Sequence, residues 1–177
     1  RKEILGILNA VLKTERISLT ERRPAVAAVS AVQKRNASAE TRFKNKIVAL
    51  ACSTGGPKAL QSVIPYLPAN LDAPMVLVQH MPAGFTNSMA NRLDEISKIH
   101  VKEAENGEIL KKGTVYIAPG GKHMEVKKCP DGSHKIVYND MPPIGGLKPC
   151  ANITYDSLRT CGYDQVVCVV LTGMGAD

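Results

Sequence analysis

The sequence predicts an α/β protein with a doubly wound, mostly parallel β-sheet, helices on both faces of the sheet and one β-hairpin. Two observations predict this Rossmann-like, three-layer arrangement. From residue 47 onward, short apolar runs alternate with segments of helical period, and such alternation is typical of βαβ units. The apolar runs are also continuous, as expected of parallel strands that are buried on both faces.

The first predicted elements are a strand, a turn and a helix. Residues 47–51 (IVALA) form an apolar run suited to a buried strand, and the turn at 53–56 (STGG) follows it. Pro57 then stands where proline favours the first turn of a helix. A second buried strand is predicted at 74–78 (PMVLV).

An amphipathic helix is predicted next, over residues 86–96. Thr86 is expected to cap this helix, and Met89, Leu93 and Ile96 fall on one face of it. The remaining predicted elements are strands at 99–101 and 114–118, a hairpin of 123–128 and 135–138 around the turn residues 130–132, a Pro/Gly-rich loop at 139–149, a helix at 151–161 and a strand at 166–171.

The N-terminal 45 residues differ from the rest of the chain in hydrophobic periodicity and in charge. Apolar residues between positions 4 and 12 recur at helical spacing and predict a short amphipathic helix, whereas residues 14–45 show no sustained period and resemble a linker, either partly helical or disordered. Residues 1–46 hold eleven Lys and Arg against four Glu, an excess equal to the net charge of +7 of the whole chain. We therefore predict a basic linker at 1–45 and one domain at 46–177.

Composition excludes several classes of protein. The chain has 177 residues, 44% hydrophobic and 22% charged, which is typical of a globular domain, and no apolar run approaches the ~20 residues that a membrane span needs. The charges of residues 47–177 balance, which argues against nucleic acid as a partner. The five cysteines form no Cys-x-x-Cys pair, so we expect no metal site, no disulfide framework and a cytoplasmic location.

Three polar side chains lie in the segments into which predicted strands exit. Ser53, His80 and Asp177 come after the strands at 47–51, 74–78 and 166–171, and ligands of open α/β sheets bind at the carboxyl ends of strands. A hydroxyl, an imidazole and a carboxylate are the components of a catalytic triad, in which the imidazole deprotonates the hydroxyl and the carboxylate orients the imidazole.

The turn after the first strand also predicts an oxyanion hole. A helix begins there, so its free N–H groups face any negative charge that forms beside Ser53. We expect the first donor to be the Thr54 N–H and a second to come from the loop at 173–175. Cys52 is a rival nucleophile, but its side chain is expected to point into the sheet.

Each feature has an alternative interpretation. In the alternative hypothesis, Ser53 or Thr54 only caps the helix, and the glycine turn binds a phosphate, as in a phosphate- or nucleotide-binding module. Against this, the turn lacks the G-x-G-x-x-G spacing and the P-loop lysine. It also lacks the G-x-S-x-G pattern of α/β-hydrolases, because Ala51 occupies the position of the first glycine.

Two further assignments stay open. The basic N-terminal segment offers a surface for nucleic acid or acidic lipid, although linkers are often charged. Among the other histidines, His123 is expected to line the cleft, and His100 and His134 are expected to be structural.

Four segments carry a pattern that is recognisable as a set. They are 51–57 (ACSTGGP), 78–82 (VQHMP), 116–120 (YIAPG) and 171–177 (LTGMGAD). In order and spacing, across residues 46–177, they resemble the catalytic domain of the bacterial chemotaxis response-regulator methylesterases.

This resemblance implies hydrolysis of glutamate methyl esters on the cytoplasmic domains of chemoreceptors, together with deamidation of receptor glutamines. It implies that Ser53 is the nucleophile, His80 the base and Asp177 the triad acid, that Met174 helps to form the oxyanion hole, and that no cofactor is needed. It further implies an N-terminal receiver domain that a chemotaxis kinase phosphorylates.

The sequence departs from the family pattern at three places. Ala51 and Cys52 replace the usual Gly-Ala before the serine, and 148–152 (KPCAN) stands where Arg-Pro-Ser-x-Asp is usual. The family continues past the triad acid, so we expect 46–177 to be a catalytic domain without its C-terminal part.

Overall fold

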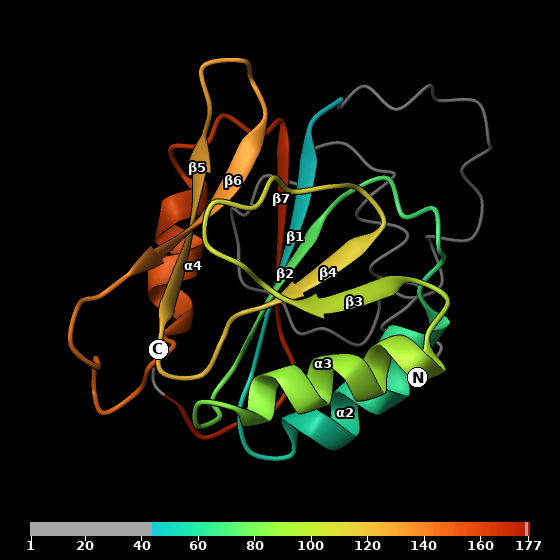
Figure 1. Ribbon diagram of the computed structural model, residues 1–177, viewed down its shortest axis with the longest axis vertical. Coiled ribbons are helices and arrows are strands. Elements are labelled where there is room, and N and C mark those ends of the chain that lie inside the picture. The colour runs from blue at the N-terminus through green and yellow to red at the C-terminus, as the bar shows by residue number, and fades with distance from the viewer. Residues whose placement is uncertain (1–43, 176) are drawn as a thin grey trace, which may run out of the picture.

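A computed structural model describes residues 44–175 and 177 of the chain and shows one parallel sheet with helices on both of its faces (Figure 1). The strands of this sheet lie in the order β3-β4-β2-β1-β7, and every neighbouring pair is parallel. The strands are β1 (Lys46–Cys52), β2 (Met75–Gln79), β3 (His100–Glu103), β4 (Thr114–Ile117) and β7 (Gln165–Val170).

The helices and a hairpin form the outer layers. Helices α2 (Gly56–Val63) and α3 (Phe85–Ile96), with the short 3-10 helix η2 (Ile64–Tyr66), lie on one side of the sheet. Helix α4 (Ala151–Leu158) and the antiparallel hairpin of β5 (His123–Lys128) and β6 (His134–Asn139) lie on the other.

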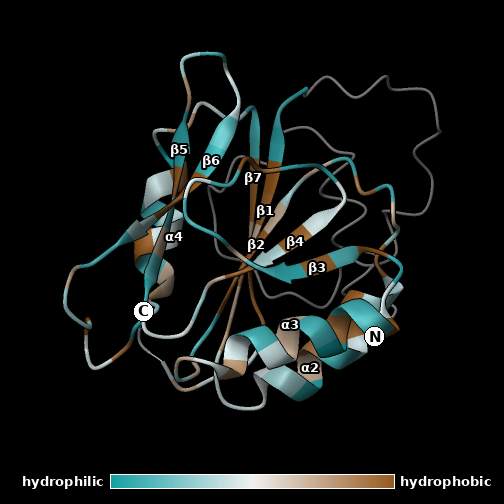
Figure 2. Cartoon of the chain, in the orientation of Figure 1, coloured by the Kyte–Doolittle hydropathy of each residue, from teal (hydrophilic) through white to brown (hydrophobic). Residues whose placement is uncertain are grey.

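Strand β1 explains why two cores form. All seven of its residues are buried, and alternate residues face opposite layers. Leu50 belongs to the same core as Leu60 of α2 and Leu93 of α3, whereas Ala49 belongs to the core that contains Leu158 of α4. Figure 2 shows this distribution, with hydrophobic residues along the central strands and hydrophilic ones on the outer surfaces of α2 and α3.

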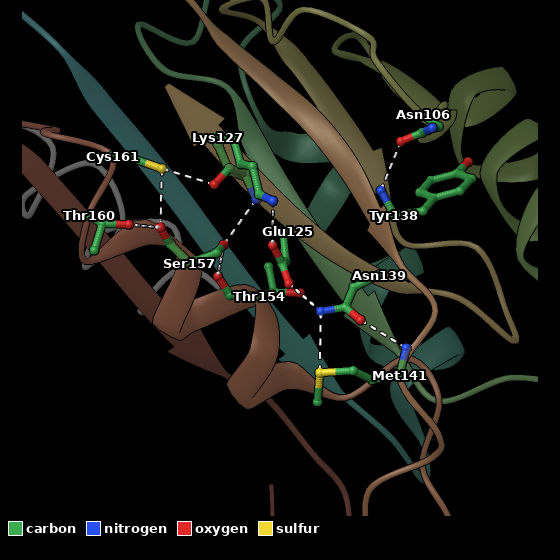
Figure 3. Close-up of polar contacts among 11 residues, drawn as sticks. Asn106, Glu125, Lys127, Tyr138, Asn139, Met141, Thr154, Ser157, Thr160 and Cys161 are labelled. Atoms are coloured by element: carbon green, nitrogen blue, oxygen red, sulfur yellow. Dashed lines mark hydrogen bonds and ion pairs between the residues drawn. The ribbon is translucent and has the colours of Figure 1, made fainter. Parts of the chain in front are cut away.

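The hairpin is fixed to the α4 segment by side-chain hydrogen bonds to its backbone (Figure 3). Thr154 Oγ1 donates to Met124 O at 2.7 Å, and Ser157 Oγ accepts the Val126 N–H at 3.0 Å. Cys161 Sγ lies 3.1 Å from Val126 O. These contacts hold α4 in place, and the N-terminus of this helix contributes to the site described below.

The predicted fold is confirmed: the sheet is parallel, helices cover both faces, and each predicted strand and helix from residue 47 onward has a counterpart. Helix α4 is shorter than predicted because residues 159–162 form a turn, with Gly162 at φ 69°. The helix predicted between residues 4 and 12 and nearly all of the linker lie outside the described residues.

The predicted N-cap of α3 is wrong. The helix begins at Phe85, after Gly84 in the left-handed region at φ 85°. Thr86 therefore lies inside the helix, where it is fully buried. Its hydroxyl donates to Glu103 Oε1 at 2.5 Å and accepts the Gly120 N–H at 2.9 Å.

Within residues 44–175, none of the helices has the length and apolar character needed to cross a membrane. The same part of the chain contains no cluster of three His, Cys, Asp or Glu side chains arranged to hold a metal ion.

Candidate active site

The site lies at the carboxyl ends of three adjoining strands, β2, β1 and β7. Ser53 follows β1 and His80 follows β2, and the segment 171–177 follows β7. The turns are also bonded to one another: the Ser53 N–H donates to Thr172 O at 2.7 Å and the His80 N–H donates to Cys52 O at 3.3 Å. Parallel strand order thus brings together residues that are up to 124 positions apart in the sequence.

The imidazole and the carboxylate are paired. His80 Nε2 lies 3.0 Å from Asp177 Oδ2, and the two side chains are only 13% and 8% exposed. The same carboxylate oxygen accepts the N–H of Ala151, the first residue of α4, at 2.7 Å. The N-terminal end of a helix carries partial positive charge and therefore favours an anion at this position.

The environment of Asp177 keeps its carboxyl group ionised. Burial acts to raise the pKa of this carboxyl group. The hydrogen bond from the Ala151 N–H, the electrostatic attraction of His80 and the hydrogen bond with His80 all lower it, and together they leave the pKa below its ordinary value. The ionised Asp177 accepts a hydrogen bond from His80 Nε2–H and so holds the ring in one orientation.

The second ring nitrogen of His80 is available for chemistry. His80 Nδ1 is buried and has no hydrogen-bond partner among the described residues. Because Nε2 carries the proton that faces Asp177, Nδ1 of the neutral ring has a free lone pair. A buried nitrogen with a free lone pair is suited to take a proton from a nearby hydroxyl.

Two glycines bring the loop after β7 against both Ser53 and His80. A Cβ atom on Gly173 would lie 2.6 Å from the Cβ atom of Ser53. A Cβ atom on Gly175 would lie 2.7 Å from Asp177 Oδ1 and 3.0 Å from His80 Cε1. The distances of 2.6 and 2.7 Å are shorter than real Cβ contacts and the distance of 3.0 Å is tight, so the loop could not approach this closely with a larger residue at either position. The loop at 173–175 therefore packs against both the serine and the histidine–aspartate pair.

No hydrogen bond joins Ser53 Oγ to His80 in the part of the chain that the structure describes. The histidine–aspartate half of the predicted triad is formed, and the serine is placed beside it through backbone contacts. Catalytic hydrogen bonds of this kind are often long before substrate binds. The roles of Ser53, His80 and Asp177 stay predictions.

The backbone around Ser53 limits which groups can form an oxyanion hole. The N–H of Ser53 is already donated to Thr172 O. The N–H of Thr54 has no hydrogen-bond acceptor among the described residues, which leaves it free for a substrate oxygen. The side chain of Met174 is 85% exposed, so a contribution from this residue would come from its backbone.

Cys52 faces the core, as predicted. Its thiol is buried and lies 3.1 Å from Gln79 Oε1. Burial raises the pKa of Cys52 to about 12, so the thiol is protonated at neutral pH and is not a nucleophile.

The expectation that His123 lines the cleft is wrong. His123 is fully buried in β5, where Nε2 lies 3.1 Å from Pro142 O and Nδ1 accepts the Cys150 N–H. Both ring nitrogens hold the loop between β6 and α4. The other two histidines are structural, as predicted: His134 Nε2 bonds to Cys161 O, and His100 Nδ1 pairs with Asp94.

Sequence reasoning missed Gln79. This side chain is 2% exposed, and its amide bonds to the backbone of both Ser53 and His80. Its signal in the sequence is a polar residue that ends an otherwise apolar buried strand.

Fold and site together define a parallel α/β protein in which a serine and a histidine–aspartate pair meet at one sheet edge. Two sequence relatives and one solved structure narrow this class. The chain is 45% identical to the protein-glutamate methylesterase/protein-glutamine glutaminase of Geobacillus kaustophilus over 158 residues, which cover 86% of this chain and 45% of that protein. It is 46% identical to a protein of the same name, numbered 1, from Syntrophomonas wolfei, over 81% of this chain and 42% of that protein.

The solved structure is the crystal structure of the Thermotoga maritima CheB methylesterase catalytic domain. It superposes with a TM-score of 0.72 at 45% identity, over 75% of this chain and 70% of that one. The sequence profile of the CheB methylesterase family matches residues 48–177. The chain belongs to the CheB methylesterase family. It spans less than half the length of these two sequence relatives.

Proposed function

We propose that this chain is the catalytic domain of a protein-glutamate methylesterase that also deamidates protein glutamine. The observation that carries the proposal is the pair of His80 Nε2 and Asp177 Oδ2, 3.0 Å apart and largely shielded from solvent, at the sheet edge where the turn that holds Ser53 also lies. The names of the two relatives supply the substrate class, a glutamate methyl ester or a glutamine in a protein.

In the proposed first step, Ser53 Oγ attacks the γ-carbonyl carbon of the ester while His80 Nδ1 takes the hydroxyl proton. The imidazolium that forms is stabilised by the ionised Asp177. The carbonyl oxygen becomes an oxyanion, which accepts the free N–H of Thr54 near the N-terminus of α2 and a further N–H from the loop at 173–175.

The tetrahedral intermediate then breaks down, and His80 gives the proton to the leaving group. His80 Nδ1 protonates the departing oxygen, methanol leaves, and the glutamyl group is bound to Ser53 as an ester. A water molecule deprotonated by His80 hydrolyses this ester and releases glutamate and free Ser53. With glutamine as substrate, the leaving group is ammonia, which depends more strongly on protonation by His80.

The proposed partners follow from the same function. The substrate is the methylated cytoplasmic domain of a chemoreceptor, and the setting is the cytoplasm. In the whole protein, a receiver domain phosphorylated by a chemotaxis kinase precedes the basic linker and controls the site. No cofactor or metal is assigned to the reaction, because each proposed step is completed by serine, histidine, carboxylate and backbone groups.

Mass spectrometry of the substrate tests the proposal. The chain is incubated with a methylated receptor cytoplasmic domain that also carries glutamines at its modification sites. We expect methyl esters and glutamines at these sites to be converted to glutamate, and other glutamines of the receptor to stay unchanged. A receptor that keeps every methyl ester and every glutamine would contradict the proposed function.

A further inference from the structure

Gln79 is a buried polar residue at the join between the sheet and the site. It is the last residue of β2, directly before His80, and the four residues before it in the strand are apolar. Only 2% of its surface is exposed. Burying an amide is unfavourable unless its polar atoms are hydrogen-bonded, so the bonds that this amide makes indicate what it does.

Those bonds lead to the two turns of the proposed site. Gln79 Nε2 donates to Ser53 O at 3.1 Å and to His80 O at 3.2 Å. Its Oε1 lies 3.1 Å from the Sγ of Cys52 and accepts the S–H. Both N–H groups of the amide are thus used, one on the residue that supplies the nucleophile and the other on the residue that supplies the base.

The surroundings are shaped to admit this amide. A Cβ atom on Gly56 would lie 1.8 Å from Gln79 Oε1, so the first residue of α2 leaves the space that the carboxamide fills. The helix that follows Ser53 therefore packs directly against Gln79. A Leu or Met side chain could fill this space, but neither could bond the two carbonyl groups.

We propose that Gln79 is a positioning residue of this active site. One amide group ties the turn of Ser53 to the turn of His80 and so sets the separation of nucleophile and base. This inference rests on the proposed function. Because a displacement of about 1 Å in a reacting group can cost on the order of 100-fold in rate, losing both bonds is expected to lower kcat by about 10- to 100-fold and to change KM little.

The test compares Gln79→Met with the wild-type chain and with Tyr116→Phe. Methionine keeps the approximate size and loses both donors. Tyr116 is a matched control, because its buried hydroxyl also bonds backbone groups, at Lys111 and Ile109, and contacts no residue of the site. Two readouts are measured well below the melting midpoint: methanol release, and the rate at which a fluorophosphonate probe labels Ser53.

We expect Gln79→Met to be labelled about 10- to 100-fold more slowly than wild type, with kcat reduced in parallel. Tyr116→Phe should lower the melting midpoint and keep the wild-type labelling rate. Labelling of Gln79→Met at the wild-type rate would overturn the inference and leave the proposed function standing. A wild-type chain that neither releases methanol nor reacts with the probe would overturn both.

Gln79→Glu is the second variant, and it decides the question if Gln79→Met does not fold. At neutral pH its carboxylate faces two carbonyl oxygens without a donor, whereas the protonated form regains one O–H donor. We expect its labelling rate, relative to wild type at the same pH, to rise as the pH falls. A ratio that does not change with pH would show that the side chain only fills space, and would overturn the inference.

Discussion

His80 Nε2 and Asp177 Oδ2 lie 3.0 Å apart in a pair that is nearly closed to solvent, and the N-terminus of α4 donates to the same carboxylate oxygen. This arrangement joins the α4 layer to the central sheet. The carboxylate is bonded to the layer that contains α4, and the imidazole follows a central strand. The electrostatics of the pair give the first two predictions.

Replacing Asp177 by Asn should lower kcat by roughly 100- to 10,000-fold. An amide in this position can donate to His80 Nε2, which would place the ring proton on Nδ1 and remove the base that faces Ser53. KM should change by less than about threefold, because Asp177 is not expected to touch the substrate. Steady-state methanol release measures both constants, and a kcat within threefold of wild type would contradict a role for the pair.

The same substitution predicts a pH dependence of stability. The pKa of Asp177 is lower in the folded chain than the ordinary value of about 3.9. Its contribution to the free energy of unfolding is therefore present above pH 4 and lost as the pH falls through the folded value. Urea unfolding should show Asp177→Asn to be less stable by about 1–2 kcal/mol at pH 7. This difference should shrink below pH 4, and a difference that is the same at pH 7 and pH 3 would contradict the assignment.

Gly175 is predicted to be required for activity more than for folding. In Gly175→Ala, the added Cβ would meet Asp177 Oδ1 at 2.7 Å and His80 Cε1 at 3.0 Å, so the pair must move apart. We expect kcat to fall at least about 10-fold. The matched control is Gly132→Ala in the hairpin turn, where φ is 85° and no atom lies within 4 Å. It should cost stability and leave kcat unchanged.

Cys52 is predicted to be inert despite its place beside Ser53. Because the thiol is buried and its pKa is about 12, iodoacetamide at pH 7 should leave Cys52 unmodified and methanol release intact. Peptide mass spectrometry checks the modification, and the same reagent in urea should alkylate Cys52. Modification of folded Cys52 in step with loss of activity would contradict the assignment of Ser53 as nucleophile.

The fold was predictable because its signals are local. The continuous apolar runs at 47–51 and 74–78 are typical of parallel strands buried on both faces, and the residues that follow parallel strands meet at one edge of the sheet. The cap of α3 and the length of α4 were harder to predict. The N-cap of α3 is a glycine in the left-handed region, Gly84, and α4 gives way at Arg159 to a turn over residues 159–162.

The site was predictable as a set of residues but not as a set of bonds. His80 and Asp177 could be identified from their positions after predicted strands. The hydrogen bond from the Ala151 N–H to Asp177 could not be predicted from the sequence around either residue, because it depends on how α4 packs against the sheet. His123 was misplaced for the same reason: it follows a Pro/Gly turn but points into the hairpin layer. Gln79 was missed because a single polar residue at a strand end has no distinctive spacing.

The most direct test of the central claim is methanol release from a methylated receptor domain by the wild-type chain and by Ser53→Ala. The variant removes one oxygen atom from a residue whose backbone is held by Thr172 and Gln79, so it should fold as the wild type does and unfold at the same urea concentration. The account predicts release by the wild type and a reduction of at least about 1,000-fold in Ser53→Ala. Undiminished release by a folded Ser53→Ala would contradict it.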